Sequence, residues 1–341
     1  MKIGLIGLAK SGKTTLFNLL TGSSVATARY DSGRAELHTG VARVPDPRVD
    51  RLAALFKPKK TTYATFEVVD LAGIAKGERA SLDTKEFRNA DALLHVVRAF
   101  ADEALGAPAP KRDIEDLETE LILADLEVIE RRLERLEASI KKQRKELEVR
   151  EQAILVRLKT ELESERPLRA VTLTPDDARA VRGFTFLSQK PILHCLNLEE
   201  SAIGEADRVV QRFGLEAVAE RAWTRIGWVS AVLEAEVAQL AGDEQRAFLA
   251  DLGLKEPAIH RVLSDCYALL GLVSFFTVGE DEVRAWPIAQ GTRAQDAAGS
   301  VHSDIGRGFI RAEVNSCDPG HLRGYTAVRR PSDSRASCTA A

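Results

Sequence analysis

The chain has 341 residues, of which 45% are hydrophobic, and a formal net charge of −3 at pH 7. This length allows two or three domains, and the charge excludes an overall basic field, so contact with nucleic acid needs a local patch or a ribonucleoprotein partner. We find neither a signal peptide nor an apolar run of membrane-spanning length, and we expect a cytoplasmic protein without membrane contact. Four cysteines, Cys195, Cys266, Cys317 and Cys338, lack metal-site spacing and are expected to be free thiols.

A phosphate-binding loop follows the first apolar run of the chain. Residues 7–15 read Gly-Leu-Ala-Lys-Ser-Gly-Lys-Thr-Thr, which matches G-x-x-x-x-G-K-[ST] between an apolar strand and a helical pattern. The glycines let the backbone wrap around phosphates, and the amides and the helix N-terminus attract their negative charge. Lys13 is expected to reach the β and γ phosphates, and Thr14 to ligate magnesium. The predicted phosphate-binding residues are Gly7, Lys10, Ser11, Gly12, Lys13, Thr14 and Thr15.

The segment 64–73 is predicted to be a strand that ends in D-x-x-G, the usual partner of a phosphate loop. Asp70 stands where a carboxylate holds magnesium through water, and the amide of Gly73 could approach the γ phosphate. The next residue is Ile74, whereas Ras-like enzymes have a glutamine here that orients the attacking water. Catalytic residues therefore stay unassigned, with Lys13 and Gly73 as candidates.

Residues 92–100 are apolar nearly throughout, which is typical of a central strand in a parallel sheet covered on both faces. His95 lies within this strand. We interpret it as a hydrogen-bonded core histidine rather than a catalyst, because nothing near it in the sequence resembles a nucleophile or a metal ligand.

Residues 111–166 contain neither glycine nor proline and are rich in Leu, Glu, Lys and Arg, which predicts helix. Apolar residues recur at heptad-like spacing, which indicates a coiled-coil seam. The polar run 141–146 is the expected point of reversal, giving an antiparallel hairpin with arms of roughly 30 to 40 Å. A single continuous helix is the alternative. The basic run is either a solvated tip or a contact for RNA or an acidic protein surface.

The strand 190–198 ends where such proteins place their base-recognition loop. Guanine-specific proteins carry N-K-x-D there, whereas this chain has Asn197, Leu198 and Glu200. Asn197 can still bind purine N7, but the longer carboxylate of Glu200 is poorly placed for the donors of guanine. Selectivity for guanine is therefore not expected. A later strand end, with Ser230 and Ala231, fits a loop that closes over the base through backbone groups.

Together these strings resemble the YchF/Obg-like ATPases, a branch of the Obg group of P-loop proteins. The resemblance runs from Met1 to about Val314. Its motifs are the phosphate loop, Val44–Arg48, Lys57–Lys60, Asp70–Ile74, Ala90–Asp91, His95–Arg98, Asn197–Glu200, Leu252–Leu254, Glu282–Trp286 and Gly308–Val314.

The resemblance implies an α/β fold: a Ras-like P-loop nucleotide domain with an inserted helical coiled-coil hairpin, followed by a ubiquitin-like TGS domain. The expected parts are residues 1–112 and 185–270 for the nucleotide domain, 113–184 for the helical insertion, 271–316 for a partial TGS domain and 317–341 for a disordered or aberrant tail. The tail is small, polar and basic without period-two alternation, so we expect it not to complete a sheet. A shifted reading frame or a truncation would explain it.

The resemblance also implies ATP hydrolysis in preference to GTP, magnesium as cofactor, association with the ribosome, and a role in translation or stress response. We expect a monomer, with possible RNA contact through the helical hairpin. In the leading hypothesis Asn197 reads the purine and Leu198 offers backbone groups to the adenine amine. Two alternatives stay open: a GTPase of the Obg group with a degenerate base loop, and a nucleotide-dependent binding module without turnover.

Overall fold

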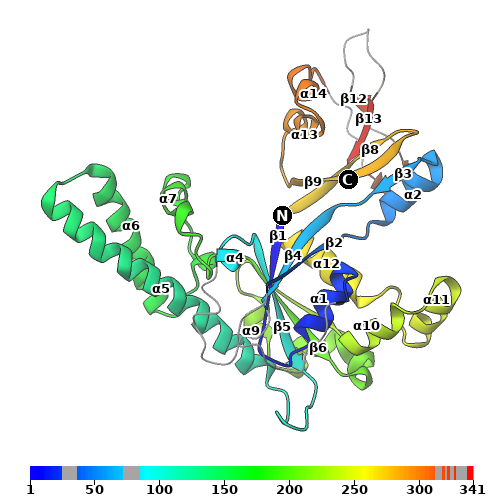
Figure 1. Ribbon diagram of the computed structural model, residues 1–341, viewed down its shortest axis with the longest axis horizontal. Coiled ribbons are helices and arrows are strands. Elements are labelled where there is room, and N and C mark those ends of the chain that lie inside the picture. Colours follow the sequence, from blue (N-terminus) through cyan, green and yellow to red (C-terminus); the bar gives the residue numbers. More distant parts are fainter. Residues whose placement is uncertain are drawn as a thin grey trace. The chain divides into compact units, whose positions relative to one another are not determined.

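The computed structural model describes residues 1–24, 37–71 and 85–311, together with the backbone of short strands at 317–318, 321–322, 326–327 and 336–340 (Figure 1). The chain divides into two compact units. The first contains Met1–Val41 and Glu67–Val262, and the second contains Ala42–Phe66 and Leu263–Ala341.

A six-stranded sheet in the order β2-β4-β1-β5-β6-β7 forms the framework of the first unit. Its strands are β1 (Lys2–Ile6), β2 (Leu37–Arg43), β4 (Thr65–Leu71), β5 (Ala92–Ala99), β6 (Ile192–Leu198) and β7 (Thr224–Val229). From β4 to β7 all neighbours pair in parallel. Every residue of β6 and nearly every residue of β5 is buried, as central strands covered on both faces require. The α/β fold predicted for this unit is confirmed.

Helices surround this sheet. They are α1 (Lys13–Thr21), α4 (Lys85–Arg88), α5 (Pro110–Lys142), α6 (Glu146–Glu163), α7 (Pro175–Val181), α8 (Val209–Arg212), α9 (Glu216–Ala219), α10 (Ala231–Val237) and α11 (Gly242–Asp251), with 3₁₀ turns η1 (Leu168–Ala170), η2 (Arg182–Phe184) and η3 (Glu200–Arg208). A further helix, α12 (Ala258–Leu269), begins in the first unit and ends in the second. In the described ranges, no helix has both the length and the apolarity that crossing a membrane demands.

The two long helices α5 and α6 lie side by side (Figure 1). The chain reverses at residues 143–145, inside the polar run where a reversal is predicted, and so it does not form one continuous helix. Arg132 pairs with Glu151, and Glu130 pairs with Lys159. The earlier residue of α5 thus contacts the later residue of α6, so the two helices are antiparallel. With 33 and 18 residues the arms are unequal, at about 50 and 27 Å, since each residue adds about 1.5 Å.

An apolar cluster fills the space along the hairpin. Its buried members are Ile122, Ile129, Leu136, Ile154, Leu155, Leu158, Leu162, Leu168, Val181 and Phe186. They come from both long helices and from the segment that follows α6, so the hairpin is stabilised by its own core as well as by helix propensity.

A five-stranded sheet in the order β12-β13-β8-β9-β3 forms the second unit. Its elements are α2 (Pro47–Phe56), β3 (Lys60–Thr62), β8 (Leu272–Val278), β9 (Glu282–Ala289), α13 (Ala294–Val301), α14 (Ser303–Arg307), β12 (Thr326–Ala327) and β13 (Ala336–Ala340), and a separate pair is formed by β10 (Cys317–Asp318) and β11 (His321–Leu322). The antiparallel pair β8–β9 is its centre, and β3 adds in parallel to β9.

Residues 42–66 belong to this second unit, although the sequence analysis assigned them to the nucleotide domain. Asp46 caps α2 by accepting from the backbone N–H of Arg48 at 3.0 Å, and Lys59 pairs with Asp281 at 2.8 Å. The guanidinium of Arg48 lies 5.0 Å from the ring centre of Phe276. A segment between two strands of the first sheet thus supplies an edge strand and a helix to the second.

The tail differs from the expectation that it cannot complete a sheet. Residues Ala336–Ala340 form β13, which pairs antiparallel with β8 from Ser337 opposite Val278 to Ala340 opposite Phe275. Strand β12 in turn pairs with β13. Backbone hydrogen bonding along an open edge depends little on side chains, so the absence of alternation did not prevent pairing here.

Candidate nucleotide site

The phosphate loop connects β1 to α1. Gly7, Lys10 and Gly12 have φ of 153°, 62° and 95°, so the loop passes through the left-handed region. A Cβ atom on Gly7 would overlap the carbonyl oxygen of Val96, and one on Gly12 would overlap Nδ2 of Asn197. Both positions therefore need glycine because neighbouring strands approach the loop closely, as well as for the turn itself.

Lys13, the first residue of α1, lies inside the loop. It is 6% exposed, and its Nζ donates hydrogen bonds to the carbonyl oxygens of Gly7 at 2.7 Å and Leu8 at 3.2 Å. Burial lowers the pKa of Lys13, and the negative charge of Asp70 opposes that shift. The loop thus holds a cation at its centre, where a phosphate group would compete for the same hydrogens.

Asp70 lies near the end of β4, opposite Leu5 of β1 in the sheet register. It is 0% exposed, and neither carboxylate oxygen has a hydrogen-bond partner in the structure. Burial raises the pKa of Asp70, while the charge of Lys13 opposes the shift. A buried carboxylate without donors is costly unless a ligand compensates it, which marks this group as a candidate for binding a cation through water.

Asn197, near the end of β6, links two loops through hydrogen bonds, and we refer to this link as the brace. Its Oδ1 accepts from the backbone N–H of Ala231 at 2.9 Å, and its Nδ2 donates to the carbonyl oxygen of Ser11 at 3.0 Å. One amide hydrogen of Nδ2 is left over, because the side chain carries two. The sequence analysis anticipated the base contact of Asn197 but not this brace.

The other base-loop residues differ in burial. The side chain of Leu198 is buried, and Glu200 is exposed and opens η3. Ser230 precedes α10, and its buried Oγ has no hydrogen-bond partner among the residues that the structure describes. The backbone N–H of Ala231 donates to Oδ1 of Asn197, so the predicted contact of this loop with the base would use its other backbone groups.

The structure brings the predicted loop residues, Asp70 and Asn197 to one end of the parallel sheet. Thr14 and Thr15 lie in the first turn of α1 and are partly exposed, Lys10 is exposed, and Ser11 is buried with no partner for its Oγ. Gly73 and Ile74 lie outside the described residues.

His95 is a hydrogen-bonded core residue, as predicted. Its Nδ1 lies 3.0 Å from Nδ1 of His194 on the neighbouring strand β6, and the two rings meet edge to face. Burial lowers the pKa of His95 to about 3, so the ring is neutral. Nε2 of His194 lies 3.8 Å from Glu118 of α5, which pairs with Arg169. The partner His194 went unrecognised because register between strands cannot be read from one sequence.

Two family models match parts of the chain. A family model described as "50S ribosome-binding GTPase" matches residues 2–131, and the model of the YchF-GTPase C-terminal domain, described as a protein of unknown function, matches residues 272–330. The second match continues past Val314, where the sequence analysis ended the resemblance.

Curated relatives match over nearly the whole chain. "Ribosome-binding ATPase YchF" of Bacillus subtilis is 39% identical over 91% of this chain and 87% of its own length. The protein of the same name from Escherichia coli O157:H7 is 37% identical over 92% and 88%. Among solved structures, the "Schizosaccharomyces pombe YchF GTPase" matches with a TM-score of 0.76 and 27% identity, covering 92% of this chain and 87% of that one.

Proposed function

The chain belongs to the YchF family of P-loop proteins, and from this premise we propose that it binds ATP in preference to GTP and slowly hydrolyses it with magnesium. The observation that carries the proposal is that a glycine loop holds a buried lysine, Lys13, and that the buried carboxylate of Asp70, which interacts electrostatically with it, has no hydrogen-bond partner among the described residues. Burying these two charged groups lowers the stability of the nucleotide-free protein, and binding of a nucleotide with its cation would offset that loss.

The phosphates would bind in the loop itself. Lys13 would exchange its bonds to Gly7 and Leu8 for bonds to phosphate oxygens, and the backbone amides of residues 10–15 would supply further donors at the N-terminus of α1. This arrangement would neutralise the phosphate charge without a change in the backbone, because the loop already has the wrapped conformation in the structure.

Magnesium fits the residues present. Thr14 can offer its hydroxyl oxygen, and the carboxylate of Asp70 lacks other partners in the structure, so both are hard oxygen donors of the kind this ion prefers. When bound, the ion would neutralise charge that develops between the β and γ phosphates. Thr14 and Asp70 would orient it.

Base selection would rest on β6 and the loop before α10. The free amide hydrogen of Asn197 would bind purine N7, and the backbone after Leu198 would meet the adenine amine. Glu200 replaces the aspartate that pairs with guanine, and it is exposed. Ser230 adds a buried hydroxyl without a partner in the structure beside this loop. We propose that these differences lower affinity for GTP.

Hydrolysis would be slow, because Ile74 stands where Ras-like enzymes have their glutamine. Lys13 and the Gly73 amide are the candidates for stabilising charge at the γ phosphate. The attacking water would be placed by backbone groups, by the phosphates of the substrate or by a partner.

We propose the ribosome as that partner, because the B. subtilis and E. coli relatives are named ribosome-binding ATPases. The hairpin tip carries exposed Lys141, Lys142, Arg144 and Lys145, which fits contact with RNA phosphates. The protein would act as a cytoplasmic monomer that regulates translation or the stress response, with its C-terminal unit corresponding to a TGS domain.

A GTPase is the second candidate, because the nucleotide-domain family model and the S. pombe protein are both described as GTPases. A module without turnover is the third. Single-turnover release of phosphate from ATP and GTP, with magnesium or with a chelator and with or without ribosomes, separates these three. Release from ATP alone that requires magnesium supports the proposal, and preferential release from GTP supports the second candidate. No release from either nucleotide under any condition contradicts both.

A further inference from the structure

The short helix α4 packs directly on the strand that carries the phosphate loop. Phe87 is 0% exposed, and a Cβ atom on Gly4 of β1 would lie 2.7 Å from its Cδ1. Phe87 shares one apolar cluster with Ile6, the residue before Gly7, and with Leu121 and Ala124 of α5. The phosphate loop, α4 and the base of the hairpin are therefore in continuous contact.

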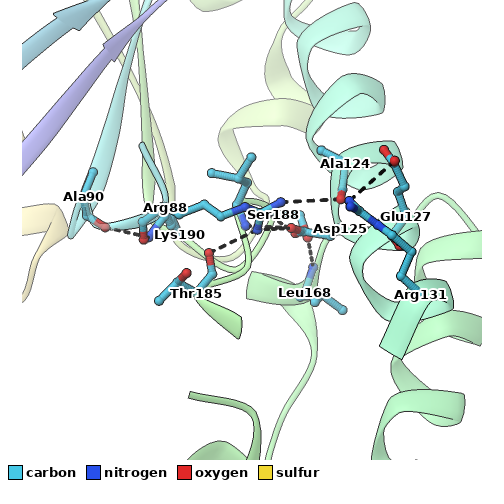
Figure 2. A network of polar contacts seen from close by, with 11 residues as sticks. Arg88, Ala90, Ala124, Asp125, Glu127, Arg131, Leu168, Thr185, Ser188 and Lys190 are labelled. Atoms are coloured by element: carbon cyan, nitrogen blue, oxygen red, sulfur yellow. Dashed lines mark hydrogen bonds and ion pairs between the residues drawn. The ribbon is translucent and has the colours of Figure 1, made fainter. Parts of the chain in front are cut away.

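The next residue, Arg88, reaches the hairpin. Figure 2 shows its guanidinium beside Asp125 of α5, with Nη1 at 3.2 Å from Oδ1. The same side chain donates to the carbonyl oxygens of Thr185 and Ala124, each at 3.5 Å. The side chains are 13% and 0% exposed, so this is a buried ion pair.

Asp125 also holds the chain that returns from the hairpin. It accepts from the backbone N–H of Leu187 at 2.9 Å and from that of Ser188, labelled in Figure 2, at 2.7 Å. The Oγ of Ser188 accepts from the N–H of Leu168, just beyond α6. The carboxylate of Asp125 on the outgoing helix α5 therefore contacts both the returning segment and α4.

Lys190, two residues after Ser188, contacts the C-terminal end of α4. Its Nζ donates to the carbonyl oxygens of Arg88, the last residue of α4, at 2.8 Å and of Ala90, between α4 and β5, at 2.6 Å (Figure 2). We refer to Phe87, Arg88, Asp125, Ser188 and Lys190 as the hairpin-root joint.

We propose that the hairpin-root joint couples nucleotide binding at the phosphate loop to the ordering of the helical hairpin. Opening the joint would separate the buried carboxylate of Asp125 from the guanidinium of Arg88. Because partial separation of a buried ion pair is costly, we expect the joint to have two states, closed and open. A nucleotide that rigidifies β1 and α4 lowers the cost of holding the joint closed. By linkage, a partner that orders the hairpin raises nucleotide affinity by the same factor. This inference rests on the proposed nucleotide binding.

Hydrogen–deuterium exchange on the full chain tests the coupling, with and without magnesium and a non-hydrolysable ATP analogue. In wild-type protein the analogue should slow exchange in residues 118–129 and 186–190, by roughly 5-fold or more if the coupling is of ordinary size. Arg88→Met should remove this protection and weaken analogue binding by the same factor.

Arg132→Met is the matched control, because Arg132 of α5 also pairs with a carboxylate, through two bonds to Glu151 of α6 at 2.7 and 2.8 Å, but lies along the hairpin rather than at its root. It should keep wild-type affinity and wild-type protection of the root. If Arg88→Met fails to fold, Arg88→Lys and Asp125→Asn are measured in the same way, and each should reduce the protection.

Three results would overturn the coupling. The first is binding of the analogue by wild type without added protection at the root, which leaves the proposed function standing. The second is a folded Arg88 or Asp125 variant that keeps wild-type affinity and protection. The third is wild-type protein that binds no analogue, which removes the proposed function along with the coupling.

Discussion

Asp70 and Asp125 are both completely buried in the first unit, yet their surroundings are opposite. Asp125 accepts hydrogen bonds from two backbone N–H groups and pairs with Arg88, whereas neither oxygen of Asp70 has a partner in the structure. Burial raises the pKa of both, and only for Asp125 do hydrogen bonds oppose it. The carboxylate of Asp125 therefore stabilises the fold, whereas that of Asp70 is the one that we propose to bind a ligand.

Replacing Asp125 is expected to have the largest effect on stability. Asp125→Ala should lower the free energy of unfolding by about 3–5 kcal/mol, because it removes the buried carboxylate with which Arg88 forms an ion pair. Glu127→Ala is the control on the same helix: its pair with Arg131 is exposed and should be worth less than about 1 kcal/mol. Denaturant unfolding measures both, and equal losses would mean that the buried pair contributes nothing special.

Lys13→Met should weaken binding of a magnesium–nucleotide analogue by roughly 100-fold, since charged hydrogen bonds of up to about 3 kcal/mol are lost. Lys10→Met is the control: its side chain is exposed, and its proposed phosphate contact is through the backbone amide, which the substitution keeps, so it should bind within a few-fold of wild type. Equilibrium fluorescence titration checks this. Similar losses in the two variants would show that the buried position of Lys13 is not what binds phosphate.

Asp70→Asn should raise the stability of the nucleotide-free protein by about 1–2 kcal/mol, because an unpaired buried charge becomes a neutral amide. The same change should remove the dependence of nucleotide affinity on magnesium. Thermal unfolding and titration with and without a chelator measure the two effects. A destabilised variant with intact magnesium dependence would place Asp70 with Asp125 as a structural residue.

The last prediction concerns the pH dependence contributed by Lys190, whose side chain hydrogen-bonds to the carbonyl oxygen of Arg88. Burial lowers the pKa of Lys190 to about 8, from 10.5. Since the unfolded chain keeps this proton up to about pH 10.5, unfolding takes up a proton between pH 8 and 10.5, and the contribution of Lys190 to stability rises across that window by at most about 1.4 kcal/mol per pH unit. The difference in unfolding free energy between wild type and Lys190→Met should follow this slope. A flat difference would contradict the burial of a titrating lysine.

The contrast between the two aspartates also separates what the sequence could predict from what it could not. Asp70 could be singled out from the sequence because the phosphate loop and the D-x-x-G string are short motifs whose residue spacing is fixed. The reversal of the hairpin at residues 143–145 was likewise predicted from composition and a polar run. Asp125 lies among many acidic residues of a helix, and nothing local distinguishes it from its exposed neighbours.

The remaining features depend on contacts between distant segments. Pairing of β3 with β9 joins residues 60–62 to 282–284, and β13 adds residues 336–340 to β8. The histidine pair His95–His194 depends on strand register. Single-sequence patterns carry little information on such pairings, because side-chain periodicity fixes which face is buried and not which strand is the neighbour.

Binding of labelled ATP and GTP analogues with magnesium tests the central claim most directly. It is measured on wild type, on Asn197→Ala and on the double variant Leu198→Lys with Glu200→Asp. We predict tighter binding of ATP by wild type, weaker binding of both nucleotides by Asn197→Ala, which loses the brace as well as the N7 contact, and a shift toward GTP in the double variant. A preference of the wild type for GTP would contradict the account and make the protein a GTPase.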